Sequence, residues 1–262
     1  MAVLNHQSYQ LETHKLSISF GGVQALSGIS LGIRHGEIYS IIGPNGAGKT
    51  TLFNCISGIY AATGGSVRFE GRELLGTKPH KIARMGIARA FQNIALFERM
   101  TVIENLMSAQ GHNMKYGLLR AALYLGRCSK EEIKSRDRVE EVIEFLDLQH
   151  LRKSYVGSLP YGLQKRVELG RALAMDPVLL LVDEPVSGMN IEETEDMARY
   201  ILDINEEMNI TVVLVEHDMG MVMELSDRVT VLNFGVKIAE GTPTEISNNP
   251  EVVSAYLGEA GN

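Results

Sequence analysis

One short stretch of the sequence has the residue types and the spacing to hold nucleotide phosphates. From Gly43 to Thr50 the chain reads GPNGAGKT, a full match to the pattern G-x-x-x-x-G-K-[ST]. Glycines let such a loop curl until its N–H groups point at phosphate oxygens, and the dipole of the following helix adds to the attraction. Lys49 can then reach the β- and γ-phosphates, and the Thr50 hydroxyl can ligate Mg²⁺. The predicted nucleotide contacts are Gly43, Pro44, Asn45, Gly46, Ala47, Gly48, Lys49, Thr50 and Thr51.

A second stretch places two carboxylates side by side after an apolar run, in LLLVDEP from Leu179 to Pro185. Burying charge is costly unless something pairs with it, so each carboxylate needs something to hold. A parallel strand that ends beside the phosphate loop would direct Asp183 to the Mg²⁺ site. Glu184, one residue further, would point elsewhere and could polarise a water molecule for attack on the γ-phosphate. The alternative interpretation is a solvated pair of acids at a strand end.

These residues need a parallel sheet to bring them to one edge, and the surrounding sequence predicts one. The loop lies between an apolar strand, EIYSIIG, and a helix closed by Gly58, which argues against a chance glycine-rich turn. After Pro177 the run VLLLVD is apolar throughout, as in strands buried on both faces of a parallel sheet. A helix (EETEDMARYILDINEEM), a strand (TVVLVE), another helix and a hairpin (RVTVLNFGVKIAEG) follow. The alternation predicts a parallel-sheet core with an inserted helical subdomain, at about residues 93–165.

Composition limits the classes of protein to consider. The 262 residues suffice for one large domain, or for one domain with a subdomain. A formal net charge of -7 argues against nucleic-acid binding by electrostatics. Two cysteines without metal spacing, Cys55 and Cys128, favour a reducing compartment. No signal-peptide pattern and no apolar run of roughly 20 residues are seen, so we expect any work at a membrane to be done from outside the bilayer.

Further segments carry a resemblance to a known family. They are FQNIALFERMTVIEN, LPYGLQKRVELGRALA, SGMNIEET, EHDMGMVMELSDRV and LNFGVKIAEGTPTEI. With the phosphate loop and the acidic pair, they make the chain resemble the ATP-binding cassette (ABC) ATPases from about Leu16 to Gly258. It is most similar to the ATPase subunits of importers for branched-chain and other hydrophobic amino acids. The resemblance implies one α/β nucleotide-binding domain over residues 1–262: a P-loop (RecA-like) core with an antiparallel β subdomain and an inserted α-helical subdomain. It also implies ATP and Mg²⁺ as cofactors.

The resemblance implies that the chain works in a larger assembly. In such families ATP is held between two ATPase subunits in head-to-tail arrangement, so one chain supplies half of each site. The implied partners are a second ATPase subunit, two membrane-spanning permease subunits and, indirectly, an extracytoplasmic solute-binding protein; no nucleic acid is expected. The second ATPase subunit would be an identical copy or a sister, and the family favours a sister. The implied location is peripheral, at the cytoplasmic face of the membrane, and the cargo is not identified by the sequence.

Four residues take roles from their positions in the family pattern. Phe20 matches an aromatic residue that stacks on adenine, with Val23 beside it, although an isolated Phe in a strand is most often part of the core. Gln92 matches the glutamine of the Q-loop, which touches Mg²⁺ or the water. His217 matches the switch histidine, which hydrogen-bonds the γ-phosphate; its alternative is to cap the helix that begins near Asp218.

Two segments that the family places against the partner subunit depart from the usual sequence. The signature normally reads LSGGQ, and here it consists of Leu159, Pro160, Tyr161, Gly162 and Leu163, followed by Gln164. Pro160 has neither a hydroxyl nor an N–H, but it suits the first turn of a helix. We therefore expect the Gly162 amide and the helix N-terminus to hold the partner's phosphate. The D-loop, Ser187 to Asn190, ends in Asn where Asp is usual.

The sequence leaves two other functions to compare with transport. One is a soluble cassette ATPase of translation, chromosome or repair systems, but the chain has one phosphate loop and no sustained heptads. The other is a small-molecule kinase, which would lack the signature and His217. Residues 111–136 form an insertion in which GLLRAALYL is predicted to be a packed helix; the alternative is a contact surface for the membrane subunits.

Overall fold

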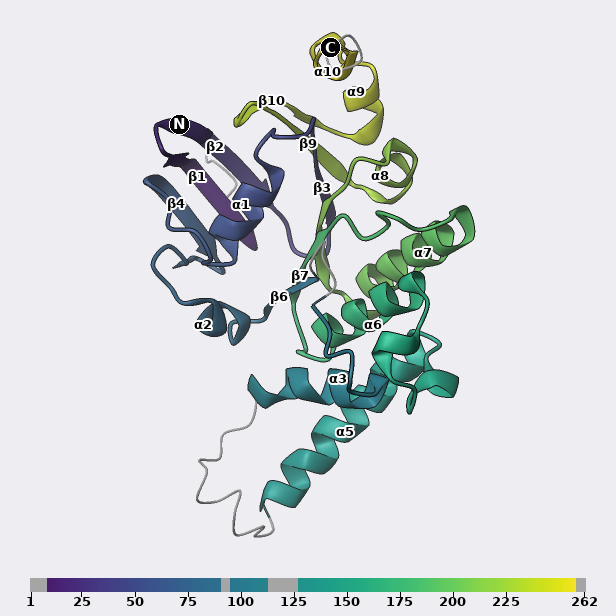
Figure 1. The fold of residues 1–262 in the computed structure, drawn as a ribbon. Coiled ribbons are helices and arrows are strands. Elements are labelled where there is room, and N and C mark those ends of the chain that lie inside the picture. Colours follow the sequence, from purple (N-terminus) through teal and green to yellow (C-terminus); the bar gives the residue numbers. More distant parts are fainter. Residues whose placement is uncertain (1–8, 91–94, 113–126, 258–262) are drawn as a thin grey trace.

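The computed structural model describes residues 9–90, 95–112 and 127–257, and in these it has two sheets with helices between and around them (Figure 1). The strands are β1 (Leu11–Phe20), β2 (Val23–Ile33), β3 (Ile38–Ile42), β4 (Gly64–Phe69), β5 (Arg72–Glu73), β6 (Ile87–Ala90), β7 (Leu179–Asp183), β8 (Thr211–Val215), β9 (Arg228–Asn233) and β10 (Val236–Gly241). The α-helices are α1 (Lys49–Ile56), α2 (Pro79–Ala83), α3 (Val102–Ala109), α5 (Arg127–Phe145), α6 (Tyr161–Leu173), α7 (Ile191–Met208), α8 (Met219–Leu225), α9 (Pro243–Ser247) and α10 (Pro250–Leu257). Short 3₁₀ turns are η1 (Gln110–His112), η2 (Gln149–Leu151) and η3 (Val156–Ser158).

The larger sheet is mostly parallel, and its central strands are buried on both faces. Its order is β10-β9-β3-β8-β7-β6; β10 pairs antiparallel with β9, and the other neighbours pair in parallel. Every residue of β3, β7 and β8 is buried, as expected of near-continuous apolar strands covered on both faces. Asp183 pairs with Val215, which pairs with Ile41. The carboxyl ends of β7, β8 and β3 therefore lie in one row at one edge.

The smaller sheet is antiparallel, in the order β2-β1-β4-β5, and packs over α1. Gly21 and Gly22 join β1 to β2 with φ values of 53° and 87°, which glycine adopts without steric cost. Leu52, Phe53 and Ile56 of α1 belong to a hydrophobic core that also contains residues of β1, β2, β3 and β8. The helix that follows the phosphate loop thus lies between the two sheets (Figure 1).

Helices cover the opposite face of the larger sheet. A second core joins α3, α5, α6 and α7 to residues of β6, β7 and β8. The helix α6 runs unbroken from Tyr161 to Leu173, so the predicted end of the helical subdomain near residue 165 falls inside a helix. The division of the chain into subdomains stays a prediction. Of the insertion at 111–136, residues 113–126, which include GLLRAALYL, lie outside the described residues.

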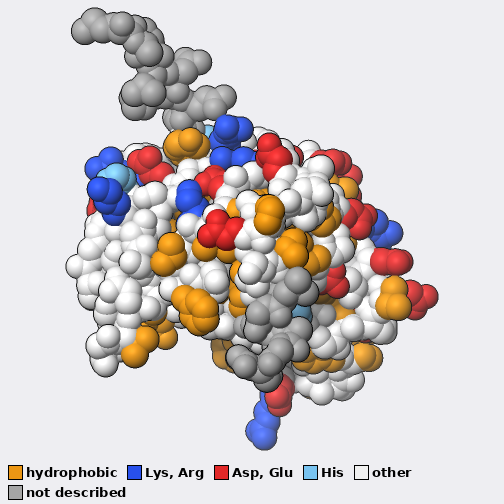
Figure 2. Space-filling view, turned by 90° about the horizontal axis from the view of Figure 1, so that it is seen from above, with side chains coloured by type: hydrophobic (Ala, Val, Ile, Leu, Met, Phe, Trp, Pro, Cys, Tyr) orange, Lys and Arg blue, Asp and Glu red, His pale blue; other side chains and the backbone are white. Residues whose placement is uncertain are grey.

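The outer surface shows charges of both signs. On the face seen in Figure 2, Asp and Glu side chains lie among Lys and Arg side chains, and the hydrophobic side chains form separate patches. This face is therefore not the uniformly basic surface that nucleic-acid binding favours. Among the helices in the described part of the chain, none combines the length and the apolar character needed to cross a membrane.

Candidate nucleotide-binding and hydrolysis site

The phosphate loop forms the turn from β3 into α1, and the packing around it requires glycine at two positions. Gly43 has a φ of 148°, and a Cβ atom there would lie 2.1 Å from the carbonyl oxygen of Leu232 in β9. Gly48 is the N-cap of α1 with a φ of 102°, and its Cβ would lie 2.8 Å from the carbonyl oxygen of Ala25 in β2. Side chains at these two positions would clash in strained backbone. The loop is thus pressed between β9 and β2, with the N-terminus of α1 beneath it.

Lys49, the first residue of α1, is held inside this loop. It is buried, and its ammonium group donates hydrogen bonds to the carbonyl oxygens of Gly43 at 2.5 Å and Pro44 at 3.0 Å. A residue outside the loop also contacts it: the N–H of Gly235 in the β9–β10 turn donates a hydrogen bond to the carbonyl of Ala47 at 3.0 Å. Thr50, one residue along, is exposed. The structure therefore places an ammonium group within the loop and an exposed hydroxyl-bearing residue in the first turn of α1.

Asp183 ends β7 in the same row as Ile41, two residues before the phosphate loop begins. Its side chain is 1% exposed, and its Oδ2 atom accepts a hydrogen bond from the Arg89 guanidinium at 2.6 Å. Burial raises the pKa of this carboxyl, while Arg89 and, more weakly, Lys49 act to lower it. The Oδ1 atom is buried and has no hydrogen-bond partner among the described residues. The carboxylate is thus held from one side, with the other oxygen available.

Arg89 of β6 is a residue of this site that the sequence reasoning missed. Besides Asp183, its guanidinium donates to the Asn54 side chain of α1 at 2.7 Å and lies 5.4 Å from the centre of the Phe53 ring. It therefore ties β6 and β7 to the helix that follows the phosphate loop. The available signal was an arginine within the short strand IARA directly before the Q-loop segment, because a charge in a buried strand needs a partner.

Arg89→Met is expected to lower the free energy of unfolding by about 3–5 kcal/mol, because Asp183 would remain as a buried charge without its cation. The double variant Arg89→Met, Asp183→Asn should recover most of this loss, since neither charge is then left alone. Urea unfolding followed by circular dichroism measures both. Arg68→Met is the matched control: its ion pairs with Glu12 and Glu73 are long, at 3.9 and 4.0 Å, and exposed, so their loss should cost no more than about 1 kcal/mol. Equal losses in the two single variants would contradict the prediction.

Glu184 has surroundings unlike those of Asp183. Its φ is 50°, a left-handed conformation that is strained for a residue with a side chain and is often found at functional sites. Its N–H donates to the Val215 carbonyl at 2.8 Å, and its own carbonyl accepts from the Lys165 ammonium at 3.4 Å. Lys165 comes from α6, and burial lowers its pKa. The Glu184 residue is partly exposed. The two carboxylates thus differ in burial and in partners, as separate roles require.

His217 lies just beyond β8, the strand between β3 and β7. Its side chain is 59% exposed. The alternative role as a helix cap is wrong, because Asp218 is the N-cap of α8 and accepts a hydrogen bond from the Met221 N–H at 2.9 Å. The imidazole is therefore not used to start the helix. It shares the carboxyl edge of three adjacent strands with the phosphate loop and Asp183.

Phe20 and Val23 flank the turn between β1 and β2 and are both exposed. The alternative that Phe20 belongs to the core is therefore wrong: its ring meets Tyr60 edge to face, with 5.1 Å between ring centres. Further along the same strand β2, Ala25 lies against Gly48 of the phosphate loop. These positions are compatible with contact to a base. Gln92 lies outside the described residues, so the structure says nothing of its predicted role.

The signature lies against the D-loop and the start of α7. Pro160 is exposed at the N-cap of α6, and Gln164 donates from its side chain to the Leu159 carbonyl at 2.8 Å. Tyr161 packs against Gly188, where a Cβ would lie 3.3 Å from its ring. Gly162 is buried, and a Cβ there would lie 2.2 Å from the Glu193 carboxylate. Leu159 is buried, and Leu163 is partly buried.

Asn190 has a structural role that its sequence context could have indicated. Its side chain caps α7 by accepting from the Glu193 N–H at 3.0 Å, and the Glu193 side chain accepts from the Asn190 N–H at 3.1 Å. This is a capping box, for which N-x-x-E is a recognisable pattern. Since Asn caps a helix about as well as Asp does, the departure at the end of the D-loop leaves the start of α7 intact.

The residues present fit a nucleotide with Mg²⁺. The described part of the chain holds no group of three or more His, Cys, Asp or Glu residues that could bind a metal by itself. Mg²⁺ that accompanies a triphosphate needs only one or two protein oxygens, because phosphates and water supply the others. The Thr50 hydroxyl and the available Oδ1 atom of Asp183 suit that role. The curled glycine loop and Lys49 suit the phosphates.

P-loop nucleoside triphosphatases share one arrangement: a parallel strand leads into a glycine loop with its lysine, and an acidic pair ends a nearby strand of the same sheet. The fold and the site place this chain in that class. Comparisons with known proteins then narrow the class. The family model described as ABC transporter matches residues 26–187, and that of the branched-chain amino acid ATP-binding cassette transporter matches residues 236–262.

Relatives match nearly the whole chain. The chain is 42% identical over 250 residues to the high-affinity branched-chain amino acid transport ATP-binding protein BraF of Pseudomonas aeruginosa, and 43% identical to LivG of Salmonella typhimurium; each match covers 95% of this chain and 98% of the relative. The solved ADP conformation of MJ1267, an ATP-binding cassette of an ABC transporter, matches with a TM-score of 0.83 and 33% identity over 95% of this chain and 99% of that one.

The chain belongs to the ABC transporter family. It is an ATP-binding cassette protein and an ATPase of that family. The predictions of the family and of the α/β P-loop fold are confirmed. The kinase alternative is wrong, and the relatives named above are transport proteins rather than components of translation or repair. The roles of individual site residues stay predictions.

Proposed function

We propose that this chain binds and hydrolyses ATP to power uptake of branched-chain or other hydrophobic amino acids, or of a related small solute, through separate membrane subunits. The observation that carries the proposal is the row formed by Asp183, Val215 and Ile41, because it sets the acidic pair at the edge where the phosphate loop begins. The class of cargo comes from the relatives, which are named for branched-chain amino acid transport.

The proposed nucleotide site divides binding among the elements described above. The backbone N–H groups of loop residues 43–51, Pro44 excepted, surround the phosphates, and Lys49 contacts the β- and γ-phosphates. Thr50 and Asp183, with Gln92, hold Mg²⁺, which when bound neutralises charge on the phosphate oxygens. Phe20 and Val23 contact the base.

In the proposed hydrolysis, Glu184 accepts a proton from the attacking water as the oxygen bonds to the γ-phosphorus and the bond to ADP breaks. His217 donates a hydrogen bond to the γ-phosphate. The products are ADP and inorganic phosphate. The strained backbone at Glu184, held by Val215 and Lys165, supports the proposal because it sets the direction in which this side chain leaves the main chain.

The proposed assembly is a head-to-tail pair of ATPase subunits on two permease subunits, peripheral to the cytoplasmic face of the membrane, with a solute-binding protein as an indirect partner. The exposed Pro160 and Tyr161 support the proposal that the signature faces the partner's ATP. The Gly162 amide and the N-terminus of α6 would hold that phosphate; Gly162 itself is buried, with the Glu193 carboxylate on the side where a Cβ would stand. A sister ATPase subunit is the favoured second copy.

Deletion of the gene in the organism that encodes this chain is expected to reduce ATP-dependent uptake of labelled leucine, isoleucine or valine to background. The wild-type chain should restore uptake, and Glu184→Gln, expressed to the same level, should not. Labelled glucose serves as a control solute whose uptake should not change. Urea and aliphatic amides are assayed alongside as related small solutes. Unchanged uptake of every one of these nitrogenous solutes would contradict the proposal.

A further inference from the structure

Glu216 is a fully buried carboxylate that the proposed hydrolysis does not use. It follows β8 directly and is 0% exposed. Its Oε2 atom accepts hydrogen bonds from the backbone N–H groups of His217 at 2.7 Å and Asp218 at 3.1 Å. Its Oε1 atom accepts from the backbone N–H of Val186 at 3.3 Å. Both oxygens are therefore engaged by main-chain groups.

The three amides belong to two different loops. His217 and Asp218 follow β8, whereas Val186 lies between Glu184 and the D-loop, which follow β7. One side chain thus joins the loop that carries the proposed general base to the loop that carries the proposed γ-phosphate ligand. The His217 imidazole also lies close, with its Nδ1 atom 3.5 Å from Oε2 of Glu216.

A carboxylate such as that of Glu216 is costly to bury, so its hydrogen bonds have to compensate for the hydration that it loses. Backbone N–H groups stabilise the charged form of a carboxylate, and the buried ammonium of Lys165 is near enough to interact electrostatically with Glu216 and with Glu184. An apolar residue of similar size would avoid the cost of burying a charge. It would also leave the three amides without an acceptor.

We propose that Glu216 is a positioning residue that holds His217 in place and couples its loop to residues 184–190. When the D-loop is displaced at the subunit interface, the Val186 amide carries that displacement to Glu216 and so to His217. The proposal rests on the role proposed above for His217. Glu216 itself touches no reacting atom.

Glu216→Gln is the sharpest test, because it keeps the shape and removes one acceptor. The amide nitrogen that replaces one oxygen would face a backbone N–H, so the side chain can serve one loop but not both. In the full chain assayed with Mg-ATP together with its second ATPase subunit, we expect kcat to fall about 10- to 100-fold. The dissociation constant for ATP should change by less than about threefold, since the loop around Lys49 is untouched.

The double variant Glu216→Gln, His217→Ala separates positioning from general damage. If Glu216 acts through His217, the double variant should hydrolyse ATP no more slowly than His217→Ala alone, within about twofold. Hydrogen exchange is the second readout. In Glu216→Gln the amides of Val186, His217 and Asp218 should exchange faster by about tenfold or more. If the fold-losses of kcat in the two single variants multiplied in the double variant, the proposal would be overturned.

Glu37→Gln is the matched control. Glu37 is also a buried carboxylate, but it precedes β3 at the opposite end of the sheet, where it accepts from Arg228 at 2.9 Å and from the Arg34 N–H. This variant should lose stability without changing kcat by more than about twofold. A fall in kcat equal to that of Glu216→Gln would show that the effect is general destabilisation and would overturn the proposal.

These experiments distinguish an error in the proposed hydrolysis from an error in the proposed role of Glu216. If His217→Ala keeps the wild-type kcat, the role proposed for His217 is wrong, and the exchange rates then decide whether Glu216 couples the loops. If His217→Ala is impaired while Glu216→Gln keeps wild-type kcat and wild-type exchange at Val186, the coupling proposed here is wrong.

Discussion

Glu184→Gln is expected to leave ATP binding intact while hydrolysis falls by about 10² or more, as the loss of a general base predicts. The side chain keeps its size, and the backbone of this residue keeps its hydrogen bonds with Val215 and Lys165. The fold and the phosphate loop should therefore be unchanged. Calorimetric titration with ATP and a phosphate-release assay measure the two quantities on the same preparation.

Asp183→Asn should fail in a different way. Its carboxylate is buried against Arg89, with one oxygen available for a metal. Neutralising it is expected to weaken nucleotide binding in the presence of Mg²⁺ by about tenfold, and to change binding in EDTA much less. Glu192→Gln is the control for both variants, because Glu192 is an exposed acid in the first turn of α7. If the two variants showed the same defect, the separate roles assigned to the adjacent acids would be wrong.

Lys49→Ala is expected to weaken ATP binding by about 10²- to 10⁴-fold. Two charge-assisted hydrogen bonds to phosphate are worth about 1.5–3 kcal/mol each, and about 1.4 kcal/mol is a factor of ten in affinity. The amides of the loop cannot replace the ammonium charge. The variant also removes the hydrogen bonds to the Gly43 and Pro44 carbonyls that hold the loop together. Isothermal titration with Mg-ATP gives the dissociation constant.

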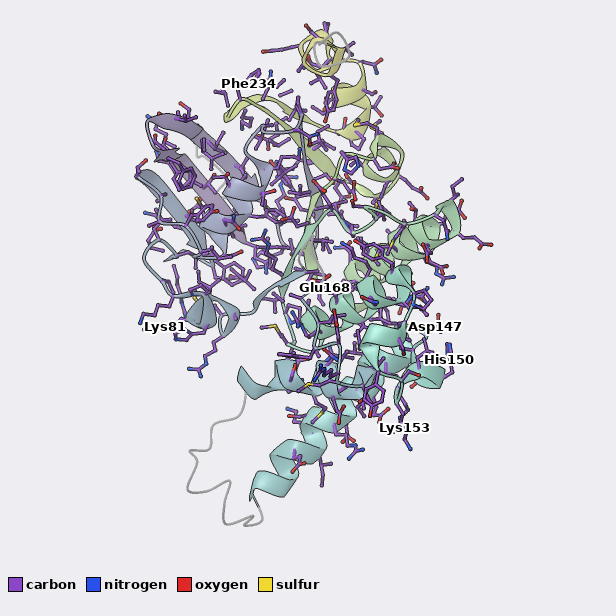
Figure 3. All side chains as sticks on the ribbon, in the orientation of Figure 1. Lys81, Asp147, His150, Lys153, Glu168 and Phe234 are labelled. Carbon is purple, nitrogen blue, oxygen red and sulfur yellow. The ribbon has the colours of Figure 1, made fainter. Side chains whose placement is uncertain are left out.

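A surface lysine provides the matched control for that prediction. Lys81 projects from α2 and is exposed (Figure 3). Lys81→Ala removes one positive charge from the chain, as Lys49→Ala does, and should leave the ATP dissociation constant within about twofold of the wild type. Near-normal affinity in Lys49→Ala would contradict the assignment of the phosphate loop. If ATP binding were weakened equally in both variants, the effect would come from the change in net charge and not from the position of Lys49.

Consecutive residues were sufficient to predict the parts of this protein whose conformation is local. The phosphate loop needs glycines in particular backbone conformations, and GPNGAGKT provides them in order; Gly43 and Gly48 adopt φ values of 148° and 102°. The run LLLVD predicted a strand buried on both faces, and β7 is that strand. Since parallel strands end at one edge of a sheet, the position of Asp183 near the loop followed from these two patterns.

The tertiary structure alone decided which charges meet and which side chains are buried. Arg89 pairs with Asp183, and Glu216 accepts a hydrogen bond from Val186. The partners in each pair are far apart in the sequence, so no local sequence pattern predicts them. Phe20, for which a place in the core was the alternative to contact with the base, is exposed at the end of β1. A buried charge needs a partner, and the sequence predicts that need. The partner is whichever group the packing of distant elements brings within hydrogen-bond distance, so it is determined only when those elements fold together.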